Sequence, residues 1–368
     1  MVMPRVKSFY DPAKTYDENF ERGPFFIGTE GEPYKQTGEP QFAFLGRPVY
    51  SPFGIPAGPL LNSKYIQYAF ERGFDILVYK TQRSVPFPVN PFPNVLFVDV
   101  EGDLTLEKAA KPLVGRSVSR LDAKKFSITN SFAVPSRGPA FWVPDFQKAR
   151  SCQGKGRLLF MSVQGTIQEG FSEDDYFEDF AVTAGLAKDA GAAVIEVNLS
   201  CPNVATEGVI CYRLDAVKTI CRKVKERISS ALLVIKIGYF SEEQSALLEK
   251  IVKGVAPYVS AISAINTIAA PVVNEKGEQA LPGPGRLRSG ICGASIKWAG
   301  LDMTRRLAAL RKKLGLRYEI IGVGGVMTPS DFFAYREAGA DVVMSATGAM
   351  WNPHLAAEIK TVLKTKGH

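Results

Sequence analysis

The sequence predicts an α/β fold, a closed (β/α)8 or TIM barrel, with an N-terminal arm and a long insertion after the second barrel strand. Short β-branched apolar segments alternate with longer amphipathic segments along most of the 368 residues. Near-continuous apolar strands separated by helices are typical of a parallel sheet that is covered on both faces. Eight such units favour a closed barrel over an open doubly wound sheet.

The expected strands and helices follow one another in regular order. The strands are expected at 51–57, 75–80, 158–164, 193–198, 232–237, 260–266, 319–323 and 341–346. The helices between them are expected at 174–189, 214–228, 242–255, 296–314 and 330–337. Gly191 and Gly339 follow two of these helices, where glycine readily takes the left-handed C-cap conformation.

Two segments fall outside this alternation. Residues 1–48 are polar and aromatic, and we expect them to form an arm that packs on a barrel spanning 49–368. The insertion, about 81–157, is too long for a simple connection and therefore suggests a functional excursion. We expect it to contain a hairpin near 101–103 and the loop that carries the substrate-binding residues.

Composition excludes several classes of function. The net charge of +8 is moderate, Lys and Arg are scattered among acids, and no nucleic-acid-binding motif accompanies them, so no nucleic-acid partner is expected. No stretch approaches the roughly 20 apolar residues of a membrane helix, and the N-terminus lacks the apolar core of a secretory signal. Five cysteines without a CxxC pair fit a reducing compartment. The sequence predicts a cytoplasmic protein without a membrane anchor.

The scarcity of histidine restricts the chemistry. Only His354 and His368 occur, so a hydrolase with a histidine base is disfavoured, and no metal site is expected. Proton transfer would therefore rely on Cys, Lys, Tyr or a carboxylate.

Polar residues end several expected strands. In such barrels, catalytic residues lie at the carboxyl ends of the strands. A buried parallel strand gains nothing from ending in Lys or Asn unless a ligand needs that group. The residues concerned are Lys80, Gln164, Asn198, Lys236 and Asn266. Together they predict a polar cavity at one end of the barrel.

Cys201 lies in the segment Val-Asn-Leu-Ser-Cys-Pro-Asn, residues 197–203, where an apolar strand gives way to a loop. A thiol there can take a proton, and Asn198 and Asn203 can each donate and accept hydrogen bonds to a flat polar ligand. A lone cysteine at a strand end is more often a small buried hydrophobe. The neighbouring amides and the rest of the chain favour the functional interpretation.

Two glycine-rich strand ends predict a phosphate site. Residues 320–326, Ile-Ile-Gly-Val-Gly-Gly-Val, precede a helix, and residues 344–348 read Met-Ser-Ala-Thr-Gly. Glycines let backbone N–H groups approach a phosphate at a helix N-terminus. Tight turns are the structural alternative. The dinucleotide fingerprint is missing, so a mononucleotide is indicated, with flavin mononucleotide (FMN) the leading candidate.

Taken together, these residues resemble the dihydroorotate dehydrogenase family, most closely its cytosolic class 1 branch, from about Ser51 to the C-terminus. Members are FMN-dependent barrels that oxidise dihydroorotate to orotate in pyrimidine synthesis. The class 1 base is the Cys of Asn-x-Ser-Cys-Pro-Asn, where the membrane-linked class has Ser. The resemblance therefore implies that Cys201 takes the C5 proton while N5 of FMN takes the C6 hydride.

The resemblance also implies the residues of the binding site. Those expected to bind the substrate are Lys80, Asn130, Ser131, Phe132, Ala133, Val134, Asn198, Asn203, Asn266 and Thr267. Those expected to bind FMN are Ala57, Gly58, Lys80, Gln164, Asn198, Lys236, Ile265, Gly293, Gly324, Gly325, Ala346 and Thr347. Lys236 would stabilise negative charge on the reduced flavin. Residues 204–208 are small enough to act as a lid over the site.

The sequence departs from the family pattern at several positions. Ala133 and Ala346 stand where the family usually has Gly, and Ser136 replaces a usual Asn. Lys236 is followed by Ile-Gly-Tyr instead of a segment that contains Pro. The excursion over 81–127 is also longer than expected. These differences weaken the orotate assignment slightly and leave substrate access open.

Alternative functions stay open on the sequence alone. A dihydropyrimidine dehydrogenase-like enzyme would act on uracil or thymine, but that branch typically has His where this chain has Asn203. A non-catalytic phosphate-binding barrel is a further alternative. The electron acceptor is undecided among fumarate, a quinone, and NAD through an iron–sulfur partner. The chain has neither an NAD fingerprint nor an iron–sulfur cysteine cluster, which favours a soluble acceptor such as fumarate. A homodimer is implied by the resemblance only.

Overall fold

Eight parallel strands close into a barrel in this computed structural model, which describes residues 8–25, 32–122, 124–200 and 209–365. The order around the barrel is β10-β11-β12-β13-β16-β17-β3-β4. The bounds are β3 (Phe53–Ile55), β4 (Ile76–Gln82), β10 (Leu158–Val163), β11 (Val194–Asn198), β12 (Leu232–Ile237), β13 (Ala261–Ala264), β16 (Glu319–Val323) and β17 (Val342–Met344). Each expected strand is present, so the predicted fold class is confirmed.

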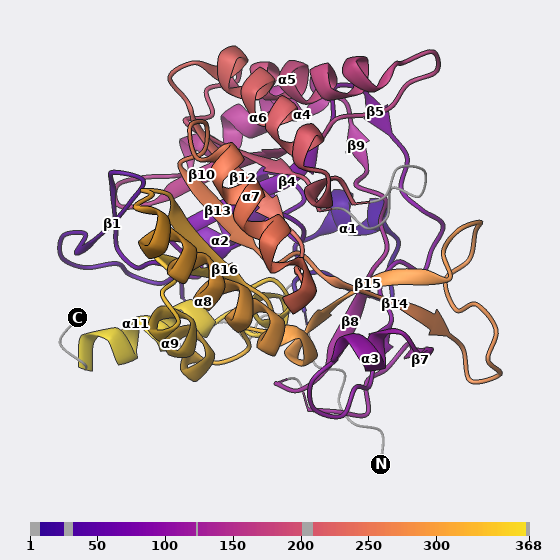
Figure 1. The fold of residues 1–368 in the computed structure, drawn as a ribbon. Coiled ribbons are helices and arrows are strands. Elements are labelled where there is room, and N and C mark those ends of the chain that lie inside the picture. Colours follow the sequence, from indigo (N-terminus) through magenta and orange to yellow (C-terminus); the bar gives the residue numbers. More distant parts are fainter. Residues whose placement is uncertain (1–7, 26–31, 123, 201–208, 366–368) are drawn as a thin grey trace.

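Helices surround the barrel and connect its strands (Figure 1). They are α2 (Ser63–Glu71), α4 (Pro139–Ser151), α5 (Glu173–Asp189), α6 (Leu214–Ile228), α7 (Ser245–Val255), α8 (Lys297–Leu314), α9 (Pro329–Glu337), α10 (Thr347–Trp351) and α11 (Leu355–Thr365). The sequence analysis did not foresee α2, α4, α10 or α11. Within the described ranges no helix combines the length and apolar character needed to cross a bilayer.

A hairpin plugs the amino-terminal end of the barrel. It consists of β1 (Phe42–Phe44) and β2 (Arg47–Val49), which pair antiparallel. The ring of Phe44 stacks on Phe160 of β10, with centroids 6.0 Å apart and planes at 7°. The backbone N–H of Leu45 donates to the carboxylate of Glu319, at 2.9 Å, where β16 begins. Because this end is filled with side chains, a ligand would have to enter from the carboxyl ends of the strands.

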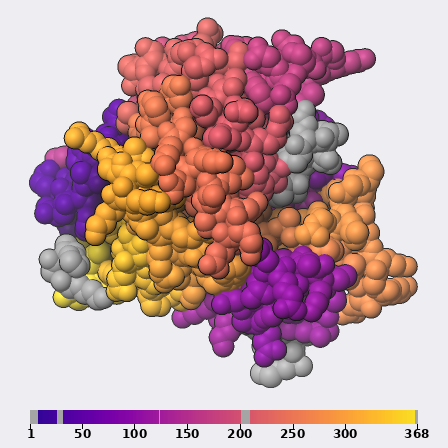
Figure 2. All heavy atoms as spheres, in the orientation of Figure 1, coloured from indigo at the N-terminus to yellow at the C-terminus, as the bar shows by residue number. Residues whose placement is uncertain are grey.

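A second, smaller closed sheet lies beside the barrel. It combines two segments far apart in sequence, in the order β14-β15-β8-β6-β7. The strands are β14 (Ile268–Val273), β15 (Arg288–Gly293), β8 (Ser127–Asn130), β6 (Phe97–Val98) and β7 (Leu113–Arg116). Figures 1 and 2 show the insertion and the β14–β15 hairpin side by side.

The sequence analysis foresaw only part of this sheet. The hairpin expected near 101–103 is the antiparallel pair β6–β7, but the connection is longer and contains α3 (Leu106–Ala109). The contribution of β14 and β15 was not predicted. Their strands pair with partners remote in sequence, which local periodicity does not reveal.

The described part of the N-terminal arm is attached to the barrel by hydrogen bonds. Its helix α1 (Tyr16–Arg22) begins with a capping box between Thr15 and Glu18. Asn62, at the start of α2, donates to the carbonyl of Phe20 at 2.9 Å. The hydroxyl of Tyr65 donates to the carbonyl of Asn19 at 2.8 Å. These contacts place α1 near the carboxyl ends of the barrel strands.

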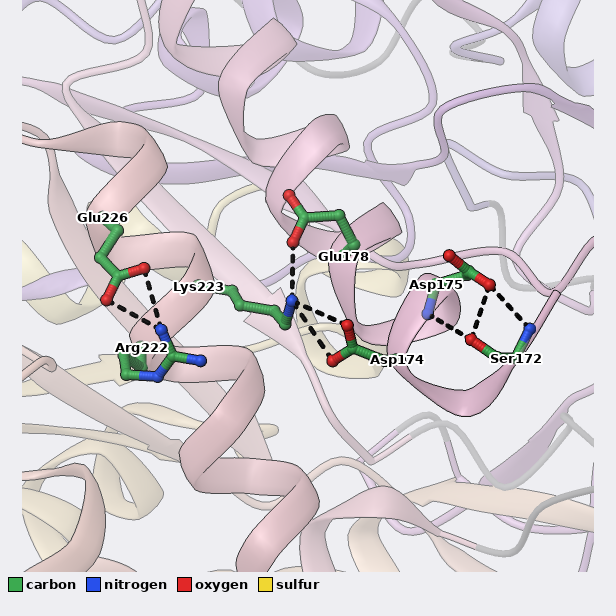
Figure 3. A network of polar contacts seen from close by, with 7 residues as sticks. All are labelled: Ser172, Asp174, Asp175, Glu178, Arg222, Lys223 and Glu226. Carbon is green, nitrogen blue, oxygen red and sulfur yellow. Dashed lines mark hydrogen bonds and ion pairs between the residues drawn. The ribbon is translucent and has the colours of Figure 1, made fainter.

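Charged residues cover the outer faces of α5 and α6. Lys223 lies 2.9 Å from Glu178 and 3.3 Å from Asp174, and Arg222 pairs with Glu226 (Figure 3). Surface pairs of this kind contribute about 0–1 kcal/mol each. The two helices are therefore held mainly by their buried apolar faces.

Candidate active site

A cavity opens at the carboxyl ends of the barrel strands, where the sequence predicted one. Twelve of the predicted site residues line it: Ala57, Gly58, Lys80, Asn130, Phe132, Val134, Asn198, Lys236, Asn266, Thr267, Ala346 and Thr347. They come from six barrel strands, from β8 and from the loops that follow these strands. The fold therefore gathers residues that are more than 280 positions apart in the chain.

Side-chain amides form a connected group on one side of the cavity. Asn198 donates to the side-chain oxygen of Gln164 at 3.1 Å. The amide of Asn266 lies 3.1 Å from the hydroxyl and 3.3 Å from the carbonyl of Ser200, and 3.4 Å from Asn198. Because each amide is oriented by another protein group, its remaining donors and acceptors face the cavity in a fixed arrangement.

Two buried lysines make the cavity positive. Lys80 and Lys236 are 6% and 5% exposed, and Lys236 donates to the carbonyl of Ala57 at 3.4 Å. No Asp or Glu occurs among the described residues that line the cavity. Two buried cations in the wall of a cavity favour an anionic ligand.

One carboxyl group lies just beneath this layer. Glu196, two residues before Asn198 on β11, is completely buried, and Ser162 donates to it at 3.0 Å. Burial raises the pKa of Glu196, whereas Lys236 and the bond from Ser162 lower it. Its second oxygen has no hydrogen-bond partner among the described residues. The balance of charge around Lys236 therefore includes a group that the sequence analysis missed.

Two glycines lie beside the cavity wall, at the end of β15 and just after β16. Gly325 has φ +64°, and a Cβ there would lie 2.7 Å from the backbone nitrogen of Lys297. At Gly293, with φ +107°, a Cβ would lie 2.6 Å from the carbonyl oxygen of Phe126. Both positions therefore require glycine. Val323, Ala346 and Thr347 line the adjoining wall.

Loop 130–136 adopts a strained backbone beside the cavity. Ala133 and Val134 have φ of +68° and +54°, the left-handed region that non-glycine residues avoid. Each such residue costs about 1–2 kcal/mol. The departure from the usual Gly at position 133 therefore has a conformational cost, and the loop needs other contacts to hold it.

Two buried arginines supply contacts of this kind. Arg83 donates to the carbonyls of Val134 at 2.9 Å and Ala133 at 3.2 Å. Arg286, from the β14–β15 hairpin, donates to the hydroxyl of Ser131 at 3.1 Å and to its carbonyl at 3.2 Å. The loop is thus held at both ends by guanidinium groups, neither of which the sequence analysis identified.

The arm also contributes to the cavity wall. Tyr10 and Tyr16 line it, and both rings pack on Phe132, with centroids 5.7 Å and 5.9 Å away. Both tyrosines are buried. The sequence analysis treated 1–48 only as a layer on the barrel, although its aromatic content was a signal that could have suggested a wall.

One cysteine of the described residues lies in the cavity wall. Cys292 of β15 lines the cavity, and burial raises its pKa to about 11, although Thr347 and Lys236 act in the opposite direction. The thiol is therefore neutral near pH 7 and is a poor base. Cys292 was not predicted as a site residue.

The remaining predicted residues fall into two groups. Ser131, Ala133, Gln164, Ile265, Gly293, Gly324 and Gly325 lie behind or beside the lining residues and do not line the cavity themselves. Cys201 and Asn203, together with the expected lid 204–208, lie outside the described residues. Their roles stay predictions.

The arrangement fits a flavin. The hydroxyl oxygen of Thr267 is buried in the wall without a hydrogen-bond partner among the described residues, so it can serve a ligand. Amides suit the flavin's pyrimidine edge, Lys236 suits its negative charge on reduction, and glycines 324 and 325 suit a phosphate. Fold and site together define a barrel enzyme that binds an anionic cofactor and a small polar substrate.

Comparison with known proteins identifies the family. The dihydroorotate dehydrogenase family profile matches residues 109–366. A dihydroorotate dehydrogenase of Dictyostelium discoideum is 37% identical over 97% of each chain. The chain belongs to the dihydroorotate dehydrogenase family, which is a family of flavin-dependent oxidoreductases. The predicted family and enzyme class are confirmed.

More distant relatives belong to two named types. A probable dihydroorotate dehydrogenase A (fumarate) of Enterococcus faecalis is 26% identical over 65% of this chain and 74% of its own. The catalytic subunit of a dihydroorotate dehydrogenase B (NAD(+)) of Alkaliphilus oremlandii is 29% identical over 68% of this chain and 76% of its own. Because both types are similar to this chain, the comparison does not choose the electron acceptor.

Proposed function

We propose that this protein oxidises dihydroorotate to orotate in pyrimidine synthesis, with FMN as its flavin. The observation that carries the proposal is the cavity, in which an amide group and two lysines lie together at the strand ends. Uncharged amides match the alternating donors and acceptors of a pyrimidine ring, and the lysines match the carboxylate and the flavin.

The role proposed for each residue follows from the position of its side chain. Asn130, Asn198, Asn266 and Thr267 hold the pyrimidine ring, with Asn203 predicted to join them. Lys80 and the backbone N–H groups of 132–134 hold the substrate carboxylate. Lys236, Ala57 and Gly58 hold the flavin ring system, and Gly324, Gly325 and Thr347 hold its phosphate. A bound flavin supplies the hydride acceptor.

Cys201 is proposed to remove the C5 proton. A thiolate is needed for this step, and the free thiol pKa of about 8.5 implies that the rate rises toward alkaline pH. Cys292 does not compete as a base, because burial raises the pKa of its thiol to about 11. The amides on either side of the expected base orient the ring and do not carry charge themselves.

The arm and the insertion are proposed to complete the substrate pocket. Residues 1–48 form an arm on the barrel of residues 49–368, and Tyr10 and Tyr16 support Phe132 from outside. The insertion, about 81–157, carries loop 130–136. The arm thus has a proposed role in substrate binding, which the sequence analysis had left open.

A stopped-flow experiment tests the proposed reaction. The flavin-loaded protein is mixed with dihydroorotate, and with dihydrouracil as the competing substrate, while flavin absorbance is followed. Cys201→Ala should slow flavin reduction by about 10²–10⁴-fold while flavin stays bound. Cys152→Ala, at a cysteine outside the cavity lining, is the matched control. Reduction of Cys201→Ala at the native rate would refute the role of Cys201.

The acceptor needs a separate measurement. Steady-state oxidation of dihydroorotate with fumarate, NAD and a quinone offered in turn identifies it. We favour fumarate because the chain has neither an NAD fingerprint nor an iron–sulfur cysteine cluster. Turnover with NAD alone would overturn this choice. The homodimer and the cytoplasmic location stay predictions.

A further inference from the structure

Arg83 is a buried side chain, held by many contacts, next to loop 130–136. It directly follows β4 and is 3% exposed. Besides the carbonyls of Ala133 and Val134, its guanidinium donates to the carbonyl of Gly165 at 2.9 Å and to the hydroxyl of Thr166 at 3.2 Å. Gly165 and Thr166 lie just beyond β10 of the barrel. One group therefore connects the loop to two neighbouring strand ends.

Several further contacts hold Arg83 itself in one position. The ring of Phe87 lies over its guanidinium, 3.9 Å from the centroid. The indole N–H of Trp142 donates to its carbonyl at 3.1 Å. The hydroxyl of Ser136, at the end of the loop, accepts from its backbone N–H at 3.4 Å. A rigid planar donor of this kind can determine the direction of the carbonyls that it binds.

The two carbonyls bound by Arg83 belong to the two left-handed residues of the loop. A strained conformation persists only where surrounding contacts determine it, and such conformations concentrate at functional sites. Binding the carbonyl of Ala133 also orients the peptide plane that carries the N–H of Val134, whereas the carbonyl of Val134 precedes Pro135, which has no N–H. The N–H of Val134 is among the donors assigned to the substrate carboxylate under the proposed function.

We propose that Arg83 is the positioning residue of the substrate-binding loop: it holds the left-handed turn at Ala133-Val134 and so orients the N–H of Val134 for the substrate carboxylate. The inference rests on the proposed function. Arg83 binds the loop from behind, through its carbonyls, and acts on the substrate through the loop. Lysine cannot replace it, because an ammonium lacks the planar fork that reaches four acceptors.

A double-mutant cycle tests the inference. The variants are Arg83→Lys, Ala133→Gly and the double variant, each loaded with FMN. Orotate affinity is measured from the flavin absorbance change, together with KM and kcat for dihydroorotate. Arg83→Lys should weaken orotate binding and raise KM by about tenfold or more, with a smaller change in kcat and flavin still bound, because small displacements of positioning groups are costly.

Ala133→Gly tests whether Arg83 acts through the strained turn. Glycine adopts a positive φ without strain, so the loop then depends less on Arg83. The orotate affinity of Ala133→Gly alone is the reference for the second background of the cycle. In the double variant, part of the affinity lost in Arg83→Lys should return. An equal loss in both backgrounds would overturn the inference, as would native affinity in Arg83→Lys.

Two further variants provide an alternative test and a control. Thr166→Val removes one acceptor of Arg83 and provides the same cycle if Arg83→Lys does not fold. Arg336→Lys changes another arginine that donates to backbone carbonyls, those of Ala340 and Asp341, outside the cavity wall. It should leave orotate affinity unchanged. If the native flavin protein does not bind orotate, the proposed function fails, independently of Arg83.

Discussion

The two walls of the cavity differ in origin. One wall consists of barrel strand ends, with Lys80, Asn198, Lys236 and Asn266, each placed by a strand whose neighbours fix its register. The other consists of loop 130–136, the arm and the β14–β15 hairpin, which lie outside the barrel. The first is held by backbone ladders. The second is held by buried side chains, with Arg83, Arg286, Tyr10 and Tyr16 in contact with the loop.

Because of this difference, we expect the barrel wall to be rigid and the outer wall to be more readily altered. Parallel strands share their hydrogen bonds with two neighbours, so a side chain at a strand end has little freedom. Loops carry fewer backbone bonds and are more readily changed in shape. We therefore expect changes in the barrel wall to affect the rate of the reaction, and changes in the outer wall to affect substrate binding.

Within the comparison of the two walls, the largest effect is expected at Lys236. Lys236→Met removes the cation assigned to the reduced flavin, and flavin reduction by dihydroorotate should slow by about 10²–10³-fold. The redox potential of the bound flavin should fall, because the reduced form loses a favourable charge. Lys253→Met, in an exposed pair with Glu249, is the control. A native rate and potential in Lys236→Met would remove the proposed contrast between the walls.

A smaller effect, on binding, is expected in the outer wall. Tyr16→Ala withdraws a ring that packs on Phe132, so KM for dihydroorotate should rise by about tenfold while kcat changes less. Steady-state kinetics with Tyr16→Phe, which keeps the ring, separates packing from the hydroxyl. Tyr258→Ala, remote from the cavity lining, is the matched truncation. A drop in kcat without a change in KM would contradict the assignment.

The pH dependence of alkylation is expected to differ between Cys292 and the predicted base Cys201. Because burial raises the pKa of Cys292 to about 11, its alkylation should be slow at pH 8 and rise about tenfold per pH unit until pH approaches that value. The predicted base Cys201 should react with an apparent pKa near or below about 8.5. Peptide mapping after timed alkylation measures both. Rapid modification of Cys292 at pH 8 would show that its thiol is not shielded.

The smallest effect is expected far from either wall. Lys223→Ala removes the ion pairs with Asp174 and Glu178 on α5, and the free energy of unfolding should fall by about 0–1 kcal/mol (Figure 3). Urea denaturation measures the change, and added salt should diminish it. Orotate binding should stay native. A loss of several kcal/mol would mean that this surface contributes more than exposed pairs usually do.

The barrel and its strand-end residues could be predicted because their signals are local. Residues 232–237 and 319–323 have the bounds expected, since a continuous apolar segment between helices specifies a buried parallel strand. Lys236 and Asn198 were found by the same reasoning, because closing the barrel brings every strand end to one rim. Positions 324 and 325 were predicted as a phosphate site from glycines that follow a strand, and this role stays a prediction.

The residues that form the outer wall could be identified only from the tertiary structure. Nothing near Arg83, Arg286 or Tyr16 in sequence indicates the loop that each contacts, because these contacts join residues 51 to 155 positions apart. Likewise, β14 and β15 complete a sheet with strands of the insertion. Local periodicity reports which face of an element is buried but carries no information on its partner, so a wall built from long-range side-chain contacts emerges only when the chain is folded.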